Sequence, residues 1–410
     1  MSEMHKTPTA NRLHIAIFGR RNAGKSSLIN ALTNQNLAIV SEFAGTTTDP
    51  VYKAMEILPI GPVVLIDTAG IDDEGVLGDL RVKKSIEVIN KTDIALIVTS
   101  DNILGEFEEK VIQLLEKKKT PFIIVMNKID IVPIDKNFIS QLENKKLPYI
   151  GVSASKKENI DELKKLIINK SPSEFEQPTI VGDLLTPDDT VILVIPIDTG
   201  MPKGRLILPE VQTMRDILDH NAKFYTTKEK GLTSVLENLK TKPKLVITDS
   251  QAFESVSADT PDDILLTSFS ILFARQKGDL TRLVKGAKAL KNLKKGDKIL
   301  IAEACTHHQQ CDDIGRVKLP KWIKEYIGGE IIFDFCNGRD FPDNMKDYKL
   351  VLHCGGCMIN RREMLSRIDT SEENEVPIVN YGVAIACMHN VLDRALKPFP
   401  EIFNEWIKQE

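Results

Sequence analysis

The sequence predicts an α/β protein made of three α/β segments, the first with a mainly parallel sheet. Short β-branched runs alternate with longer stretches of helical periodicity over residues 13–168. A polar stretch with two prolines, 171–179, then interrupts the pattern and indicates a linker. The alternation resumes twice beyond it, and a chain of 410 residues is expected to form two or three domains.

In the first segment, the β-branched runs predict strands with helices between them, which is the pattern of a doubly wound sheet. These runs are 14–18, 63–67, 94–100 and 122–127. A helix is expected at 26–34, directly after the first strand.

The two later segments repeat the pattern with shorter elements. The second predicts strands at 191–197 and 222–227 and helices at 209–220 and 231–239. The third predicts a helix at 280–293 and strands at 298–302, 330–335, 350–353 and 376–380. With a boundary near Pro261, we expect three domains, 1–172, 180–261 and 262–410.

The composition is that of a soluble globular protein, with 42% hydrophobic and 27% charged residues. A net charge of −4 argues against a strongly basic nucleic-acid binder. No apolar run approaches the roughly 20 residues of a membrane-spanning helix, and residues 1–12 lack the apolar stretch of a signal peptide. We therefore expect a cytoplasmic protein that binds neither nucleic acid nor membrane.

One loop carries the pattern of a phosphate-binding P-loop. The run from Gly19 to Ser26, GRRNAGKS, matches G-x-x-x-x-G-K-[ST] and lies between a predicted strand and a predicted helix. Its backbone N–H groups can surround phosphates, Lys25 can reach the β- and γ-phosphates, and the Ser26 hydroxyl can bind Mg²⁺. The residues expected to contact the nucleotide here are Gly19, Asn22, Ala23, Gly24, Lys25, Ser26 and Ser27.

Two further motifs follow strands and complete a nucleotide site. Asp67 opens the run DTAG, in which its carboxylate can hold the Mg²⁺ shell and the Gly70 N–H can meet the γ-phosphate. Asn127 opens the run NKID, which includes Lys128 and ends at Asp130. The Asp130 carboxylate can accept two N–H bonds from guanine, which adenine cannot donate, so we expect GTP and GDP as ligands.

The run Ser153-Ala154-Ser155 fits the loop that packs beside the base. The whole set resembles the translation-factor-type GTPases of the TrmE–Era–EngA group. That resemblance implies that the run 45–49, GTTTD, is the first switch and that Thr47 senses Mg²⁺. We therefore expect Lys25, Thr47 and Gly70 to be the catalytic residues.

GTP hydrolysis is predicted to be slow unless another group assists it. Ile71 stands where a water-orienting glutamine would follow the DTAG run, so slow intrinsic hydrolysis is expected. Asn22 resembles the asparagine of potassium-dependent relatives, in which K⁺ replaces an arginine finger. The alternative is that Asn22 only shapes the loop, and the sequence favours neither.

The C-terminal segment carries a candidate metal site. All six cysteines lie between Cys305 and Cys387, which in a cytoplasmic chain indicates metal or redox chemistry rather than disulfides. Cys305-Thr-His307 follows one predicted strand and His353-Cys354-Gly-Gly-Cys357 follows another. Because the carboxyl ends of parallel strands meet at one edge, these side chains are expected to converge.

The ligand types allow either a Cys₂His₂ zinc site or a 4Fe–4S cluster, and the residues alone leave both open. We do not expect the remaining cysteines, Cys311, Cys336 and Cys387, to be ligands. Cys387 lies in an apolar helical pattern and is expected in the core.

A GTPase domain followed by Cys-x-His and, after a long gap, His-Cys-x-x-Cys resembles the FeFe-hydrogenase maturation GTPases, the HydF family, over the whole chain. The resemblance implies a C-terminal Rossmann-like domain that holds a 4Fe–4S cluster on Cys305, Cys354 and Cys357. The fourth ligand varies in such proteins, and the candidates here are His307, His353, Asp312 and Asp313.

The resemblance also implies a function and partners. Such proteins receive a diiron precursor made with two radical-SAM maturases and deliver it to the FeFe-hydrogenase apo-protein, and their middle segment forms a homodimer. The alternative is an RNA- or ribosome-associated GTPase with a structural zinc domain. The net charge and the missing basic and aromatic RNA-binding pattern argue against that alternative.

Overall fold

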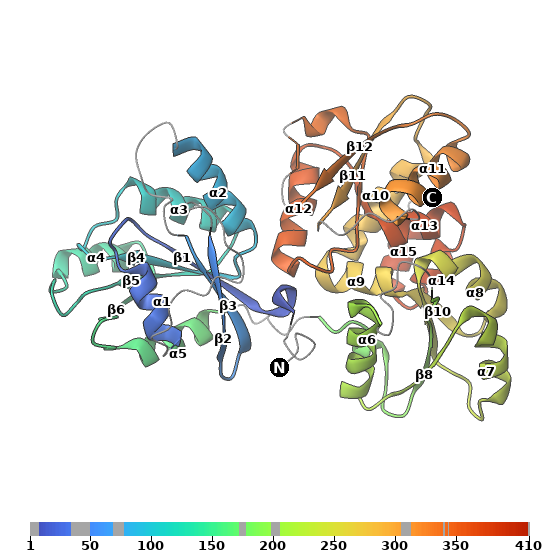
Figure 1. Cartoon of the computed structure of the whole chain (residues 1–410), viewed down its shortest axis with the longest axis horizontal. Helices are drawn as coiled ribbons and strands as arrows, with labels where there is room; N and C mark the ends of the chain where they lie inside the picture. The colour runs from blue at the N-terminus through green and yellow to red at the C-terminus, as the bar shows by residue number, and fades with distance from the viewer. Residues whose placement is uncertain are drawn as a thin grey trace. The chain divides into compact units, whose positions relative to one another are not determined.

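The computed structural model describes residues 8–33, 50–68, 78–171, 178–197, 206–304, 313–338, 341–342 and 344–408, and only the backbone of 78–83. The chain forms two compact units, Met1–Glu176 and Gln177–Glu410 (Figure 1). The first carries one sheet and the second carries two. The predicted α/β class with three successive sheets is confirmed.

The described part of the first unit is a six-stranded sheet in the order β2-β3-β1-β4-β5-β6. All neighbouring pairs are parallel except β2 with β3. The four predicted strands are present, and the edge strands β2 and β6 are additional. The bounds are β1 Leu13–Phe18, β2 Val51–Ile57, β3 Gly61–Asp67, β4 Ile94–Thr99, β5 Phe122–Met126 and β6 Tyr149–Gly151.

Helices cover both faces of this sheet because its central strands are buried throughout and present apolar side chains to each side. On β1, Leu13, Ile15 and Ile17 join one core, while Ala16 and Phe18 join the other. The helices are α1 Lys25–Thr33, α2 Gly78–Asn90, α3 Glu106–Lys117, α4 Lys136–Asn144 and α5 Ile160–Lys170.

The described part of the second unit holds two four-stranded sheets, and every paired strand in them is parallel. The first has the order β10-β9-β7-β8 and the second β12-β11-β13-β14. The bounds are β7 Thr190–Val194, β8 Lys223–Thr227, β9 Leu245–Thr248, β10 Leu265–Ser268, β11 Lys298–Glu303, β12 Ile332–Asn337, β13 Leu350–His353 and β14 Ile378–Asn380.

Strand β10 pairs with β9, although the boundary expected near Pro261 would assign it to the third segment. The turn that contains Pro261 connects α8 to β10 inside the first of the two sheets. A proline-containing turn marks a change of direction, and it does not show whether the next strand returns to the same sheet. The first of these sheets therefore extends beyond residue 261.

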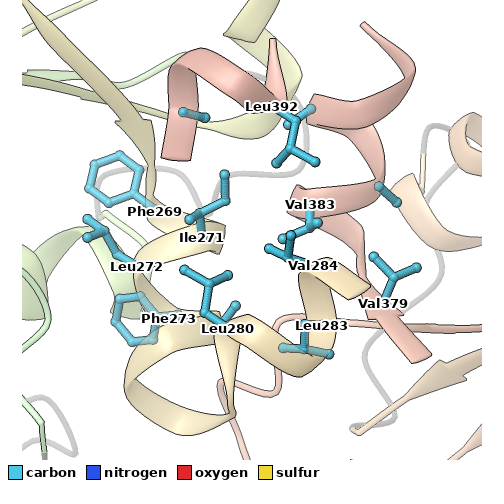
Figure 2. Close-up of a cluster of buried hydrophobic side chains, with 14 of the residues drawn as sticks. Phe269, Ile271, Leu272, Phe273, Leu280, Leu283, Val284, Val379, Val383 and Leu392 are labelled. Carbon is cyan, nitrogen blue, oxygen red and sulfur yellow. The ribbon is translucent and has the colours of Figure 1, made fainter. Parts of the chain in front are cut away.

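The two sheets of the second unit share one hydrophobic core. Helix α9, which follows β10, is apolar around most of its circumference, and Figure 2 shows Phe269, Ile271, Leu272 and Phe273 from it. Side chains of α10 and α13 lie beside them, as do Val379 and Leu392. The helices are α6 Leu208–Asp219, α7 Leu232–Asn238, α8 Phe253–Asp259, α9 Phe269–Lys277, α10 Leu280–Lys291, α11 Leu319–Ile327, α12 Arg361–Glu373, α13 Tyr381–Met388, α14 Leu392–Leu396 and α15 Pro400–Lys408.

Candidate nucleotide and metal sites

The P-loop connects β1 to α1, as its pattern predicts. Gly24 has a φ of +91°, and a Cβ there would lie 2.2 Å from Asn127 Nδ2, so only glycine fits. Lys25, the first residue of α1, is buried, and its Nζ donates to the carbonyls of Gly19 and, at 3.0 Å, Arg20. The loop therefore folds around its own lysine, with the ammonium held inside it.

Two oxygen groups suited to Mg²⁺ meet beside this loop. The Ser26 hydroxyl donates to Asp67 Oδ2 at 2.9 Å. Asp67 ends β3 and is only 7% exposed, and within the described residues its other carboxylate oxygen has no hydrogen-bond partner. A buried carboxylate oxygen without a partner is costly, and Mg²⁺ prefers such hard oxygen ligands. Thr47 and Gly70 lie outside the described residues.

The NKID loop is fastened to the P-loop by its first two side chains. Asn127 is buried and donates from Nδ2 to the Ala23 carbonyl at 3.0 Å. Its Oδ1 accepts the Ala154 N–H at 3.1 Å. Lys128 Nζ donates to the Asn22 carbonyl at 2.6 Å. Three loops that are distant in sequence are thus held together at the carboxyl edge of the sheet.

The Asp130 carboxylate is oriented by the loop that follows β6. Ser153 Oγ donates to one of its oxygens at 2.7 Å and Ser155 Oγ to the other at 3.2 Å. The Ser153 hydrogen bond is the main reason that the pKa of Asp130 lies below its usual value. Asp130 is therefore ionised and positioned to accept from a ligand.

Arg20 is a P-loop residue that the motif does not assign. Its guanidinium donates to Asp101 at 2.8 Å and to Glu108 at 3.1 Å. Glu108 lies in the first turn of α3 and is fully buried. The partners are about eighty residues away in sequence, so no local pattern could indicate this contact.

The candidate metal site lies at the carboxyl ends of β11 and β13. Cys354 follows β13, and its Sγ accepts the Ala304 N–H at 3.2 Å. The Gly356 N–H also donates to Cys354. Burial raises the pKa of the Cys354 thiol, and these two donors oppose the rise. Amides that point at sulfur favour the thiolate, which is the form that binds metal.

The third predicted cysteine, Cys305, lies outside the described residues, as do His307 and Asp312. Within the described ranges, no group of three metal-binding side chains gathers. Asp313 is described, and its side chain accepts the Arg316 N–H at 2.9 Å, where it caps a π-helical turn over Ile314–Lys318.

His353 was a candidate ligand, and the structure places it inside the protein. It is fully buried at the end of β13, Nδ1 contacts the Cys354 carbonyl at 2.7 Å, and Nε2 contacts Arg367 at 3.1 Å. Burial, followed by the nearby Arg367 charge, lowers the pKa of His353 to about 3. The ring is neutral and both nitrogens are engaged, so neither is available to a metal in this arrangement.

Lys277, the last residue of α9, supports the same loop and was not predicted. It is 4% exposed, and its Nζ donates to the carbonyls of Cys357 at 2.9 Å, Ile359 at 3.1 Å and Gly356 at 3.4 Å. Burial lowers the pKa of Lys277 to about 8, against the opposing influence of Cys357 and Cys354. A lysine at the end of an apolar helix gives no sequence signal of such a role.

The remaining described cysteines differ in position. Cys387 is 5% exposed in the core, as predicted. Cys336 lies on β12 opposite Ala302 of β11, and burial raises the pKa of its thiol to about 11. The Tyr381 hydroxyl, at the start of α13, is buried without a hydrogen-bond partner among the described residues.

Within the described ranges, none of the helices combines the length and the apolar character that crossing a bilayer requires.

Among known proteins, the segment 14–128 matches the model of the 50S ribosome-binding GTPase family. The chain is 35% identical over 194 residues to GTPase Der of Mycoplasmopsis pulmonis, and the match covers 43% of this chain and 44% of that protein. It is 38% identical over 161 residues to the tRNA modification GTPase MnmE of Desulforamulus reducens, covering 38% and 34%. The chain thus spans less than half the length of these relatives.

Solved structures give more distant likenesses. Era from Aquifex aeolicus matches with a TM-score of 0.34 and 23% identity, over 52% of this chain and 91% of that one. The G domain of the FeoB iron transporter of T. maritima matches with a TM-score of 0.31 and 23% identity, over 39% and 98%. Likenesses this distant say nothing about function.

The second unit matches two family models that lie end to end. Residues 180–278 match the hydrogen maturase F dimerization domain, and residues 281–398 match the hydrogen maturase F tetramerization domain. Together these two matches cover more than half of the chain, and the GTPase match precedes them in the order that the cysteine and P-loop motifs led us to expect. The chain therefore belongs to the hydrogen maturase F (HydF) family.

Proposed function

We propose that this protein is a GTP-hydrolysing scaffold that holds a 4Fe–4S cluster and delivers a diiron precursor to apo FeFe-hydrogenase. The observation that carries the proposal is the Cys354–Cys357 loop at the carboxyl edge of the last sheet. Amide donors point at its sulfur and a buried ammonium supports it. These features suit an anionic metal–thiolate group better than a pair of thiols without a ligand.

In the nucleotide site, Lys25 would contact the β- and γ-phosphates, and Ser26, Asp67 and Thr47 would hold Mg²⁺ and its water shell. Lys25 would exchange its present carbonyl partners for phosphate oxygens. The Gly70 N–H would meet the γ-phosphate. Nucleotide binding would then set the conformation of the loops around Thr47 and Gly70, and we infer that this is the switch that controls cargo transfer.

In the cluster site, Cys305, Cys354 and Cys357 would bind three irons. The cluster, when bound, supplies a fourth iron whose ligand can be exchanged for one from the incoming cargo. Both ring nitrogens of His353 already contact protein groups, the Cys354 carbonyl and Arg367. The candidates for the fourth protein ligand are therefore His307, Asp312 and Asp313. The two radical-SAM maturases and the apo-hydrogenase would be the partners of this site.

The two sites are expected to be separable. Cys354→Ser removes a cluster ligand but lies in a different compact unit from the GTPase motifs. We expect the variant, purified anaerobically, to lose its bound iron and sulfide and to hydrolyse GTP at nearly the rate of the unmodified chain. Cys387→Ser is the matched control, since it changes a described cysteine in the core and should keep the iron. Iron retained in Cys354→Ser, or GTP hydrolysis lost together with the iron, would contradict the proposal.

A second candidate function is a ribosome- or RNA-associated GTPase with a structural zinc site. The family description matched by residues 14–128 favours it. The two hydrogen maturase F matches in the rest of the chain favour the scaffold instead. Zinc in place of iron in the purified protein would support the second candidate.

A further inference from the structure

The ammonium of Lys277 is a buried positive charge whose acceptors are all neutral. Three carbonyls of the Cys354–Cys357 loop and its continuation accept from Nζ, at 2.9 to 3.4 Å. Within the described residues no carboxylate forms an ion pair with it, and the side chain is almost completely removed from water. Carbonyl dipoles satisfy the three donors, but they leave the charge itself without a counter-ion.

The surrounding structure fixes this ammonium in place. Arg361, at the start of α12, donates from Nη1 to the carbonyls of Gln276 and, at 2.7 Å, Gly278, on either side of Lys277. The end of α9 is therefore held by a second cation while Lys277 turns toward the cysteine loop. Figure 2 shows that the preceding turns of α9 are packed in the shared core, so the lysine starts from a rigid helix.

The other buried cation near the loop is already engaged. Arg367 contacts His353 Nε2 at 3.1 Å, donates to the Gly338 carbonyl and lies over the ring of Phe341. Lys277 instead touches the backbone of Cys357 directly. Arg367 also acts on the Cys354 thiol through its charge, whereas Lys277 additionally holds the backbone of the cysteine loop.

We propose that Lys277 is a positioning residue that holds the Cys354–Cys357 loop and supplies the counter-charge for an anionic iron–sulfur cluster bound there. This rests on the proposed function, because it requires the cluster at these cysteines. Three thiolates give the oxidised cluster a net negative charge, and reduction by one electron adds another. A fixed cation stabilises the reduced form more than the oxidised form, so Lys277 raises the reduction potential of the cluster.

The test compares two substitutions of similar length. Lys277→Met removes the charge and Lys277→Arg keeps it, while Lys288→Met removes a cation that lies over Trp406, away from the cysteine loop. Each protein is purified anaerobically, its iron and sulfide are measured, and the midpoint potential is determined by a redox titration followed by EPR. The rate of iron loss to a chelator gives a second readout that does not depend on any activity.

We expect Lys277→Met to shift the midpoint potential to more negative values and to lose iron several-fold faster, with Lys277→Arg and Lys288→Met close to the unmodified chain. Loss of the cluster from Lys277→Met alone would also support the proposal. An unchanged potential and iron-loss rate in Lys277→Met, or equal loss of the cluster from Lys277→Met and Lys277→Arg, would overturn it. An unmodified chain without iron would instead refute the proposed function itself, and the role of Lys277 with it.

Discussion

The half-buried Asp130 carboxylate lies at the end of its loop, with one hydroxyl donating to each oxygen. Its remaining lone pairs can accept the two N–H groups of guanine. In Asp130→Asn, the amide donor would face one of these N–H groups, so GTP should bind at least about tenfold more weakly. Xanthosine triphosphate, which carries a carbonyl in place of one donor, should gain affinity. Measurement of both affinities checks this, and unchanged GTP binding would contradict the assignment.

The ionisation of the same carboxylate predicts how GTP affinity depends on pH. The pKa of Asp130 is lowered, chiefly by the hydrogen bond from Ser153. The carboxylate therefore stays ionised at every pH above the usual pKa of an aspartate. GTP affinity should therefore be constant from pH 8 to about pH 5 as far as this group decides it, and should fall only in stronger acid. In Ser153→Ala the pKa of Asp130 should rise, so this fall should begin at a higher pH.

A substitution at Asn22 can distinguish two hypotheses: that its side chain helps to bind K⁺, or that the residue only shapes the loop. Its φ is +63°, and its carbonyl accepts from Lys128. Asn22→Gly keeps this left-handed backbone available while it removes the side-chain amide. If the amide helps to bind K⁺, replacing K⁺ by Na⁺ should slow GTP hydrolysis in the unmodified chain and have little effect in Asn22→Gly. Equal rates in both salts for the unmodified chain would refute potassium dependence.

At the residue scale, local motifs predicted where the nucleotide-site residues lie, while their roles stay predictions. The P-loop, the DTAG run and the NKID run each lie beside a strand that the pattern also predicted, and the described members of all three meet at one sheet edge. Lys277, Arg20 and the buried setting of His353 were missed because their partners lie far away in sequence. A contact such as Lys277 with Cys357 depends on how two helices pack, which no local pattern records.

Helix α10 packs against β14 so closely that only glycine fits at the contact. A Cβ on Gly286 would lie 1.9 Å from the carbonyl oxygen of Ile378. Gly286→Ala should force the helix away from the sheet and lower the free energy of unfolding of the second unit by about 3 kcal/mol. Lys285→Ala, an exposed neighbour on the same helix, should change it by less than about 0.5 kcal/mol. Denaturant unfolding of the two variants checks this, and equal effects would contradict the packing.

Two physical features distinguish the strands that sequence patterns missed. Strand β2 pairs at the edge of the first sheet and has a mixed polar sequence that is mostly exposed or half-buried. Strand β6 has three residues and β9 has four, so each offers little periodicity, although β13 and β14 are equally short and were predicted. The long buried strands β1, β3, β4 and β5 were predicted because a continuous β-branched run needs no alternation to be recognised.

The middle sheet presents an unpaired edge in the described part of the molecule. Strand β8 pairs on one side only, and Tyr225 is 50% exposed. Lys223 N–H points toward β7, so by alternation the N–H groups of Phe224 and Thr226 point outward. This edge lies in the segment that matches the dimerization domain, and we infer that a second copy pairs with it.

Thr226→Pro tests this inference because it removes an outward N–H and leaves the β7 ladder intact. The variant should fold and run as a monomer, or as a smaller oligomer than the unmodified chain, in size-exclusion chromatography with light scattering. Tyr225→Pro is the comparison, since it removes an N–H that faces β7 and should destabilise the sheet. An unchanged oligomeric state in a folded Thr226→Pro would contradict pairing at this edge.

The whole molecule joins a nucleotide site in one unit to a cysteine loop in the other, and the proposed scaffold function depends on what that loop binds. The most direct measurement is the content of iron, sulfide and zinc in the anaerobically purified chain, together with an EPR spectrum after reduction. We predict iron and acid-labile sulfide in equal amounts, about four of each per chain, and a signal from a reduced 4Fe–4S cluster. One zinc per chain without iron would contradict the account.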